Sequence, residues 1–317
     1  MSLLTVDNVK KTYTTRFGGN PVHALKGVSF SVEEGEYVAI MGESGSGKTT
    51  LLNILAAFDQ PTSGQVFLED RLLSGIRESS LAAFRRDNLG FVFQEFNLLD
   101  TFSIKDNILL PLVLGGKSPD EMETRLISVA KTLGIADLLQ KFPYEVSGGQ
   151  KQRTAVARAI ITNPKLIFAD EPTGALDSSS AGDLLRTFGK INENGQTILM
   201  VTHSVDAASH ASRVMFIRDG VVFHQIYRGQ CTNEQLYKKI SDTLTMLKHA
   251  NGTDDVNFIG TEQNAGKIKD GVKFTGTEQN VGKIKDAVNS IVTEQNAGNL
   301  SGGVSADKYT TEKRGNN

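Results

Sequence analysis

Residues 42–49 form a glycine-rich stretch that reads Gly-Glu-Ser-Gly-Ser-Gly-Lys-Thr. In the spacing G-x-x-x-x-G-K-[ST], backbone N–H groups cradle phosphate oxygens, the lysine reaches the β and γ phosphates, and the last hydroxyl binds Mg²⁺. An apolar run (37–41) precedes the loop and a helix-like stretch (50–58) follows it, which is the order that phosphate binding requires. We therefore predict a nucleotide-binding loop with the contact residues Gly42, Glu43, Ser44, Gly45, Ser46, Gly47, Lys48, Thr49 and Thr50.

Two carboxylates, Asp170 and Glu171, follow directly on a second apolar run at 165–169. A carboxylate at the carboxyl end of a strand beside a phosphate loop can hold Mg²⁺, directly or through water. Asp170 is the candidate for this role, together with Thr49. Glu171 stands one position later and points elsewhere, so we expect it to act as the general base for an attacking water. The pair alone could be two solvated carboxylates, but the complete phosphate loop favours the catalytic interpretation.

A second candidate anion site consists of Ser147, Gly148, Gly149 and Gln150, which open a helix-like stretch rich in small residues. Serine and glycine at a helix start offer N–H donors and a hydroxyl. The site lies 147 − 48 = 99 positions beyond the lysine of the loop, and one γ-phosphate does not need two complete cradles from one chain. We therefore expect it to contact a nucleotide held by another copy of the chain, although these four residues alone are more often a loop.

Three single residues complete the candidate site. Gln94 follows the apolar run 89–93 and could contact Mg²⁺ or water, and His203 follows the run 197–201 and could contact the γ-phosphate. Tyr13 lies upstream of the loop and could stack on adenine through its ring face. Each is weak evidence by itself, because a lone histidine or tyrosine is more often structural.

Short apolar runs and one long helical region must position these residues. Strands are predicted at 28–32, 37–41, 65–68, 89–93, 165–169, 197–201 and 214–217. The last three are bounded by polar or turn residues and are typical of buried parallel strands between helices. From 103 to 162 the pattern is helical. The predicted fold is α/β, with a mostly parallel core sheet and a helical insertion.

The bulk composition fits a globular protein, with 317 residues of which 39% are hydrophobic and 22% charged. A net charge of −2 without a basic stripe argues against nucleic acid as a partner. Cys231 is the only cysteine, which excludes an intrachain disulfide and fits a cytosolic compartment. Residues 1–10 do not resemble a signal peptide. The longest apolar stretch, 108–114, is far shorter than the ~20 residues of a membrane span, so we expect the chain not to cross a bilayer by itself.

Beyond about residue 250 the composition changes and a repeat of period 16 appears. The tetrapeptide Thr-Glu-Gln-Asn recurs at 261, 277 and 293. The unit is too short and too polar to bury a core of its own, and its regular glycines weaken a helix. We interpret residues 251–317 as a mostly disordered, low-complexity tail. A small repeat that binds a ligand or the cell wall is the alternative.

Taken together, these motifs resemble the nucleotide-binding subunit of ATP-binding-cassette (ABC) transporters. They occur in the family's order over about residues 1–230, and valine at 146 and glycine at 174 stand where leucine and serine are usual. Ala56-Ala57 stands where glycine is common, and the repeat tail is not part of the family's pattern. The matching segments are Tyr13 (A-loop), 42–49 (Walker A), 93–95 (Q-loop), 146–150 (signature motif), 166–171 (Walker B), 174–177 (D-loop) and 202–203 (H-loop).

The resemblance implies a fold, a reaction and partners. It implies a P-loop NTPase cassette at 1–235 with an antiparallel β subdomain, a helical insertion at about 96–162 and a last helix at 236–250. Glu171, His203 and Gln94 would be catalytic, ATP would be the nucleotide, and Thr49, Gln94 and Asp170 would hold Mg²⁺. Two copies would form a head-to-tail dimer with two ATP at its interface. The dimer would dock on a separate membrane permease, which places the chain on the inner face of the cell membrane.

Finer matches point to a subgroup. Residues 91–99 and 170–177 resemble ATPases of lipoprotein release, macrolide export and peptide-antibiotic (bacitracin-type) export, and 97–101 with 107–108 most resemble the last branch. The expected function is therefore to power export of, or resistance to, antimicrobial peptides. Lipoprotein release, cell-division-type mechanotransmission and a non-transport cassette ATPase are the alternatives. A GTPase or small-molecule kinase is a further alternative, but it would leave 147–150 unexplained. In another alternative, the tail makes the chain an adaptor or regulatory binding module, and the ATPase activity is secondary.

Overall fold

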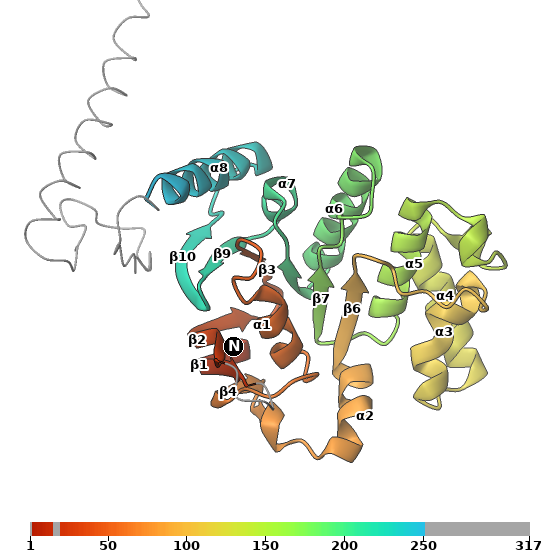
Figure 1. Ribbon diagram of the computed structural model, residues 1–317. Coiled ribbons are helices and arrows are strands. Elements are labelled where there is room, and N and C mark those ends of the chain that lie inside the picture. The colour runs from red at the N-terminus through yellow and green to blue at the C-terminus, as the bar shows by residue number, and fades with distance from the viewer. Residues whose placement is uncertain (1, 15–19, 251–317) are drawn as a thin grey trace, which may run out of the picture. The chain divides into compact units, whose positions relative to one another are not determined.

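The computed structural model describes residues 2–14 and 20–250, with side chains to residue 247. The predicted repeat tail lies outside the described residues. Two sheets are present, one four-stranded in the order β2-β1-β4-β5 and one six-stranded in the order β10-β9-β3-β8-β7-β6 (Figure 1). The strands are β1 (Ser2–Tyr13), β2 (Val22–Glu33), β3 (Tyr37–Met41), β4 (Ser63–Leu68), β5 (Arg71–Leu72), β6 (Leu89–Phe93), β7 (Leu166–Asp170), β8 (Thr197–Val201), β9 (Arg213–Arg218) and β10 (Val221–Tyr227). The α-helices are α1 (Lys48–Leu55), α2 (Glu78–Asn88), α3 (Ile104–Leu114), α4 (Pro119–Thr132), α5 (Gly148–Ile160), α6 (Ser178–Glu193), α7 (Val205–Ala208) and α8 (Asn233–Ala250).

The six-stranded sheet is the mostly parallel core that the sequence predicts. β3 pairs in parallel with β8 and β9, and β7 pairs in parallel with β6 and β8. Only β10 runs antiparallel, as the partner of β9. All five residues of β3 and of β8 are buried. Continuous apolar runs are expected here, because elements cover both faces of a parallel sheet.

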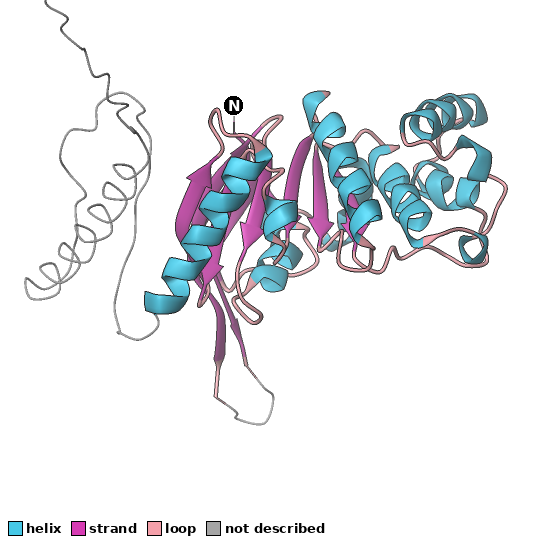
Figure 2. Ribbon diagram, turned by 90° about the horizontal axis from the view of Figure 1, so that it is seen from above, coloured by secondary structure: helices cyan, strands magenta, loops and turns pink. Residues whose placement is uncertain are grey.

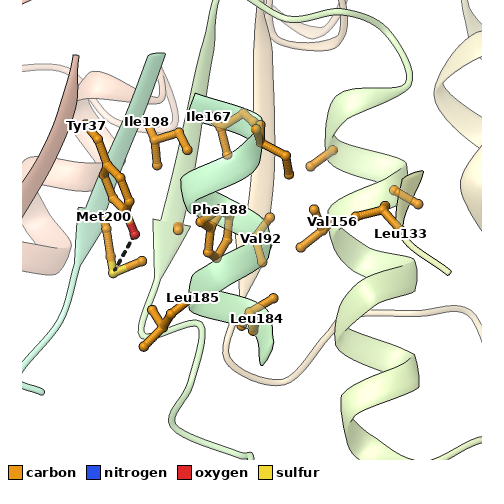
Figure 3. Close-up of a cluster of buried hydrophobic side chains, with 14 of the residues drawn as sticks. Tyr37, Val92, Leu133, Val156, Ile167, Leu184, Leu185, Phe188, Ile198 and Met200 are labelled. Atoms are coloured by element: carbon orange, nitrogen blue, oxygen red, sulfur yellow. Dashed lines mark hydrogen bonds between the residues drawn. The ribbon is translucent and has the colours of Figure 1, made fainter. Parts of the chain in front are cut away.

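Two buried clusters lie on the two faces of this sheet. One joins the antiparallel sheet to α1 and includes Val38 and Ile40 of β3. The other gathers side chains from the strands, α5 and α6 around Phe188, which is fully buried (Figure 3). Within it the Tyr37 hydroxyl donates to Met200 Sδ at 3.8 Å. The central strands are therefore fixed from both sides, and their carboxyl ends provide a rigid base for loops.

The helical insertion forms a group of its own beyond the edge strand β6 (Figures 1 and 2). α5 packs on β6 and α3, and α3 packs on α4. The predicted helical region 103–162 thus contains three α-helices, with two short 3-10 helices, Ala136–Leu138 and Pro143–Glu145, between α4 and α5. Proline at 119 begins α4, where its missing N–H has no cost. α3 begins with a capping box between Ser103 and Asp106.

Some elements differ from the sequence prediction. The first helix begins at Lys48 and ends at Leu55, because Ala57 adopts a left-handed φ of 55° and turns the chain back. β2 begins at Val22, six residues before the predicted start, and α8 begins at Asn233. The sequence did not predict β1, β5, β10, α2, α6 or α7. Among the described residues, no helix is long and apolar enough to cross a membrane.

Candidate functional site

The glycine-rich loop connects β3 to α1, and two of its glycines are needed for close backbone contacts. A Cβ at Gly42 would lie 2.3 Å from the Ile217 carbonyl oxygen. Gly47 has a φ of +103°, and a Cβ there would lie 2.6 Å from the Ala24 carbonyl oxygen. No side chain caps α1 and its first turn has no acidic residue. Its N–H donors and the positive end of its dipole are thus left for an anion.

Lys48 bends back over the loop that precedes it. Its Nζ donates to the carbonyl oxygens of Gly42 and Glu43, both at 2.8 Å. Burial lowers the pKa of Lys48, and the charges of Glu171 and Asp170 oppose that shift. The buried Ser46 Oγ has no hydrogen-bond partner. A loop with an unsatisfied hydroxyl and an inward ammonium fits a bound phosphate chain, as the sequence predicts.

Asp170 ends β7 next to this loop. Burial raises the pKa of Asp170, the neighbouring charge of Glu171 raises it further, and Lys48 lowers it. Carboxylate and hydroxyl oxygens, here Asp170 and Thr49, are the donors that Mg²⁺ prefers. In the described part of the chain, no three His, Cys, Asp or Glu residues gather as a metal cluster. A Mg²⁺ at this position would therefore take most of its ligands from phosphates and water, as Mg²⁺ commonly does.

The Glu171 carboxylate is held by the loop after β8. Pairing of β7 and β8 sets Asp170 opposite Val201, and the Glu171 N–H donates to the Val201 oxygen at 2.9 Å. Glu171 Oε2 accepts from the Thr202 hydroxyl at 3.1 Å and the His203 N–H at 3.3 Å. Glu171 Oε1 lies 2.9 Å from His203 Nδ1. Glu171 also adopts a left-handed φ of 45°. The structure thus brings together two predicted residues and adds a contact from Thr202, which the sequence analysis named only as part of the H-loop match.

Gln94 lies close to the same strand ends, because β6 pairs with β7 so that Phe93 faces Asp170. The loop that carries Gln94 is held by α5. Gln152 Nε2 donates to the oxygens of Phe93 and Pro172, at 3.3 and 2.7 Å. Arg158 donates to the Phe96 and Asn97 oxygens, at 2.8 and 2.5 Å. These two α5 residues give no motif signal, and the sequence analysis did not find them.

The second predicted anion site lies at the start of α5. The Ser147 N–H donates to Gln150 Oε1 at 2.9 Å, and the Ser147 hydroxyl accepts from the Gln150 N–H at 3.4 Å. Ser147 and Gly148 are exposed, and Gly149 is buried. The cavities beside Glu171, His203 and the phosphate loop are not lined by any residue of 147–150. In one chain this helix start therefore does not line those cavities, although Gly148 lies near Leu176, which lines the cavity beside Glu171.

Tyr13 ends β1 and is 43% exposed. Its hydroxyl donates to Asp59 Oδ2 at 2.9 Å. Burial raises the pKa of this hydroxyl most, and Thr50, in the first turn of α1, is near enough to act in the opposite direction. The predicted base-stacking residue is therefore close to the helix that begins at the phosphate loop.

Comparison with known proteins agrees with this geometry. The family model described as "ABC transporter" matches residues 25–174. The bacitracin export ATP-binding protein BceA of Halalkalibacterium halodurans is 47% identical over 248 residues, covering 78% of this chain and 97% of that protein. The macrolide export ATP-binding/permease protein MacB of Syntrophobacter fumaroxidans is 44% identical, over 70% of this chain and 31% of that protein. The dimeric cassette MJ0796 bound to ADP and Pi has 38% identity and a TM-score of 0.64, covering 71% of this chain and 98% of that one.

The fold and the site define a P-loop ATPase of the cassette type, and ATPase domains of this type bind ATP. The chain belongs to the ABC transporter family, as an ATP-binding subunit. The predicted fold class and family are thereby confirmed. Cassettes of this family hydrolyse ATP, form dimers and work with membrane permeases.

Proposed function

We propose that this chain hydrolyses Mg²⁺-bound ATP in a head-to-tail dimer and drives a separate permease that exports, or confers resistance to, an antimicrobial peptide. The observation that carries the catalytic part is the fixed Glu171 carboxylate, bonded to Thr202 and His203 beside the phosphate loop. A fixed, partly buried carboxylate is well placed to accept a proton from water.

Tyr13 stacks on the adenine ring in this proposal, and the catalytic and metal-binding residues have the following roles. Lys48 exchanges its two loop carbonyls for β- and γ-phosphate oxygens, and Thr49, Asp170 and Gln94 hold Mg²⁺, which neutralises phosphate charge when bound. Glu171 takes the proton of the attacking water. His203 is 75% exposed while its Nδ1 faces Glu171, so its other ring nitrogen is free to reach the γ-phosphate.

The dimer part rests on the exposed start of α5. Ser147 and Gly148 are exposed at the start of this helix, and a helix N-terminus attracts phosphate. In a head-to-tail pair, each α5 would complete the site on the other copy. The relative MJ0796 is a dimer in its solved structure, which supports this arrangement.

The permease part rests on an apolar groove between the core and the helical insertion. The groove has a volume of about 580 Å³, and its lining includes Phe58, Phe91, Leu110, Leu114 and Arg158. Leu114 is 66% exposed. Arg158 also holds the loop after Gln94, so a segment seated in the groove would contact the support of a catalytic residue. MacB carries a permease in the same chain, whereas this chain covers 31% of it, so we assign the groove to a permease on a separate chain.

The cargo and the location follow from the relatives. BceA is named for bacitracin export, so a peptide antibiotic is the first cargo to test. A chain that uses cellular ATP and docks on a permease lies at the inner face of the membrane. The relatives do not favour the lipoprotein-release alternative, because they are named for bacitracin and macrolide export.

A pull-down and a sensitivity assay test this proposal together. The tagged chain, purified from detergent-solubilised membranes of its own cells, should bring down a polytopic membrane protein, and Leu114→Asp should lose it while keeping its fold. A strain lacking the gene should become more sensitive to bacitracin, and wild type but not Glu171→Gln should restore resistance. Retention of the membrane protein by Leu114→Asp would move the docking site elsewhere, and full complementation by Glu171→Gln would overturn the ATPase role.

A further inference from the structure

The ring of Tyr13 is held from two sides. Side chains alternate along a strand, so Lys11 and Tyr13 of β1 lie on one face. The Lys11 ammonium stands 4.9 Å from the centroid of the Tyr13 ring, within the distance of a cation–π contact. At the other end of the ring, the hydroxyl donates to Asp59 Oδ2 at 2.9 Å. Both the ring face and the phenol oxygen are thus restrained.

Asp59 links these two contacts. Its Oδ1 accepts from Lys11 Nζ at 2.6 Å, and Lys11 also donates to the Gln60 oxygen at 2.7 Å. The Lys11 side chain is 13% exposed and that of Asp59 30%. Burial alone would raise the pKa of Asp59, but the bonds from Lys11 and Tyr13 outweigh it and lower the pKa. Asp59 is therefore an ionised acceptor at neutral pH, and bonds to an ionised group are the stronger ones.

The backbone of Asp59 is hydrogen-bonded to α1, the helix that follows the phosphate loop. After α1 ends, the N–H groups of Phe58 and Asp59 both donate to the Asn53 oxygen, at 2.8 and 3.2 Å. The chain therefore turns back toward α1 and carries the carboxylate with it. Burial raises the pKa of the Tyr13 hydroxyl, whereas Thr50, in the first turn of α1, acts to lower it. The ring is thereby fixed relative to the phosphate loop.

We propose that Asp59 and Lys11 are positioning residues, which hold Tyr13 as a platform for the nucleotide base with one ring face covered and the other open. The inference rests on the proposed role of Tyr13 in stacking on adenine. A side chain that is already immobilised loses little entropy when a ligand binds. Asp59 and Lys11, which we call the Tyr13 clamp, therefore increase affinity for the base. Neither residue belongs to the phosphate loop.

Inorganic tripolyphosphate provides a ligand that has the phosphates but no base. We suggest titrating the full-length chain with ATP and with tripolyphosphate for wild type, Asp59→Asn, Lys11→Met and Tyr13→Phe. The Kd for ATP should rise about 3- to 10-fold, less than for Tyr13→Ala, because base–aromatic stacking contributes at most a few kcal/mol. The Kd for tripolyphosphate should not change. In ATPase assays the effect should appear in KM and not in kcat.

Matched variants separate the clamp from a general structural role. Lys105→Met breaks a different surface ion pair, with Glu123 at 3.1 Å, and should leave ATP affinity and activity at wild-type values. Asp59→Asn in a Tyr13→Ala background should cause no further loss, because two residues acting through one ring are not additive.

Three results would overturn the proposal. Unchanged ATP affinity in both Asp59→Asn and Tyr13→Phe would rule out the positioning role of Asp59, although Tyr13 could still stack on the base. Equal weakening of ATP and tripolyphosphate would show that Asp59 supports only the phosphate loop. Unchanged ATP affinity in Tyr13→Ala would show that Tyr13 does not bind the base at all. If Asp59→Asn fails to fold, Tyr13→Phe decides, since it removes only the hydroxyl.

Discussion

Gly174 lies directly against the side-chain amide of Gln94. A Cβ at position 174 would come within 2.9 Å of both Cδ and Nε2 of Gln94. Gly174 follows the strand end that carries Asp170 and Glu171, and Gln94 follows the neighbouring strand. The absence of a side chain at 174 therefore leaves room for the amide of Gln94 beside the loop that follows β7. Position 174 is also one where the sequence departs from the usual serine.

Gly174→Ala is expected to displace Gln94 and slow ATP hydrolysis. The loss should be at most ~10-fold, because the amide is flexible and a full 1 Å misplacement of a reacting group costs about 10². Gly189→Ala is the matched control, since a Cβ there meets no atom within 4 Å. Phosphate-release rates at saturating Mg²⁺ and ATP give the comparison. Equal rates in both variants would mean that Gln94 finds another productive position.

Glu171→Gln should bind ATP as wild type does but lose turnover by about 10²–10⁴-fold, the range for removal of a general base. The glutamine oxygen can still accept from Thr202 and the His203 N–H, so the local geometry is kept. ATP should then accumulate in a trapped dimer, visible by size-exclusion chromatography with light scattering. Glu234→Gln, on the exposed side of α8, serves as the control. Hydrolysis at the wild-type rate would assign the base to another residue.

Gly148→Asp tests whether the start of α5 acts on a partner copy. The nearest atoms to a Cβ at 148 are 3.8 and 3.9 Å away, on Leu176 and Phe96, so the fold should tolerate the change. A carboxylate there would repel the γ-phosphate across the interface. ATP binding per monomer should survive, while ATP-dependent dimerisation and hydrolysis should fail. Loss of ATP binding by the monomer would place the motif in the same chain's site.

Asp170→Asn should make the nucleotide-free protein more stable. Burial and Glu171 raise the pKa of Asp170 above its usual 3.8, so the unfolded chain is the stronger acid. The carboxyl therefore stabilises the fold most below pH ~4, and this contribution is lost as the pH rises through the folded-state pKa. At neutral pH the variant should melt about 1–4 °C higher, yet gain nothing from Mg²⁺ with ATP.

Calorimetry or fluorescence melting at pH 7 measures this effect, with Asp242→Asn on the exposed face of α8 as control. A lower melting temperature for Asp170→Asn would show that Lys48 outweighs burial and that the carboxylate stabilises the free protein.

The sequence predicted the central strands well and several surrounding elements poorly. β3 and β8 have the predicted bounds, because a strand buried on both faces is one continuous apolar run. β1 was missed because its apolar residues are interrupted at Asn8, where φ is 45° and the pairing with β2 shifts register. α6 was missed although Leu184, Phe188 and Ile191 are buried at helical spacing, because two glycines and three serines dilute the pattern.

The candidate site likewise contains residues that the sequence predicted and residues that it did not. Motif spacing was enough to name Lys48, Glu171 and His203, because each motif is local in the chain. The partners that fix them are distant in sequence. Thr202 reaches Glu171 through the register of β7 and β8, and Gln152 bridges the ends of β6 and β7 from a separate helix. Such contacts depend on strand order and register, which a single sequence does not determine.

α5 links two separate parts of the candidate site. Ser147, which caps its exposed start, and Arg158, which holds the loop after Gln94, are 158 − 147 = 11 residues apart, or about 16 Å at 1.5 Å per residue. An unbroken helix of this length behaves as a stiff rod. A shift of Ser147 would therefore move Arg158 and the Phe96 and Asn97 carbonyls that it holds. Conversely, a displacement of that loop would shift the start of α5. In the proposed dimer, contact of the second copy with the start of α5 would therefore be coupled to the position of the loop that carries Gln94.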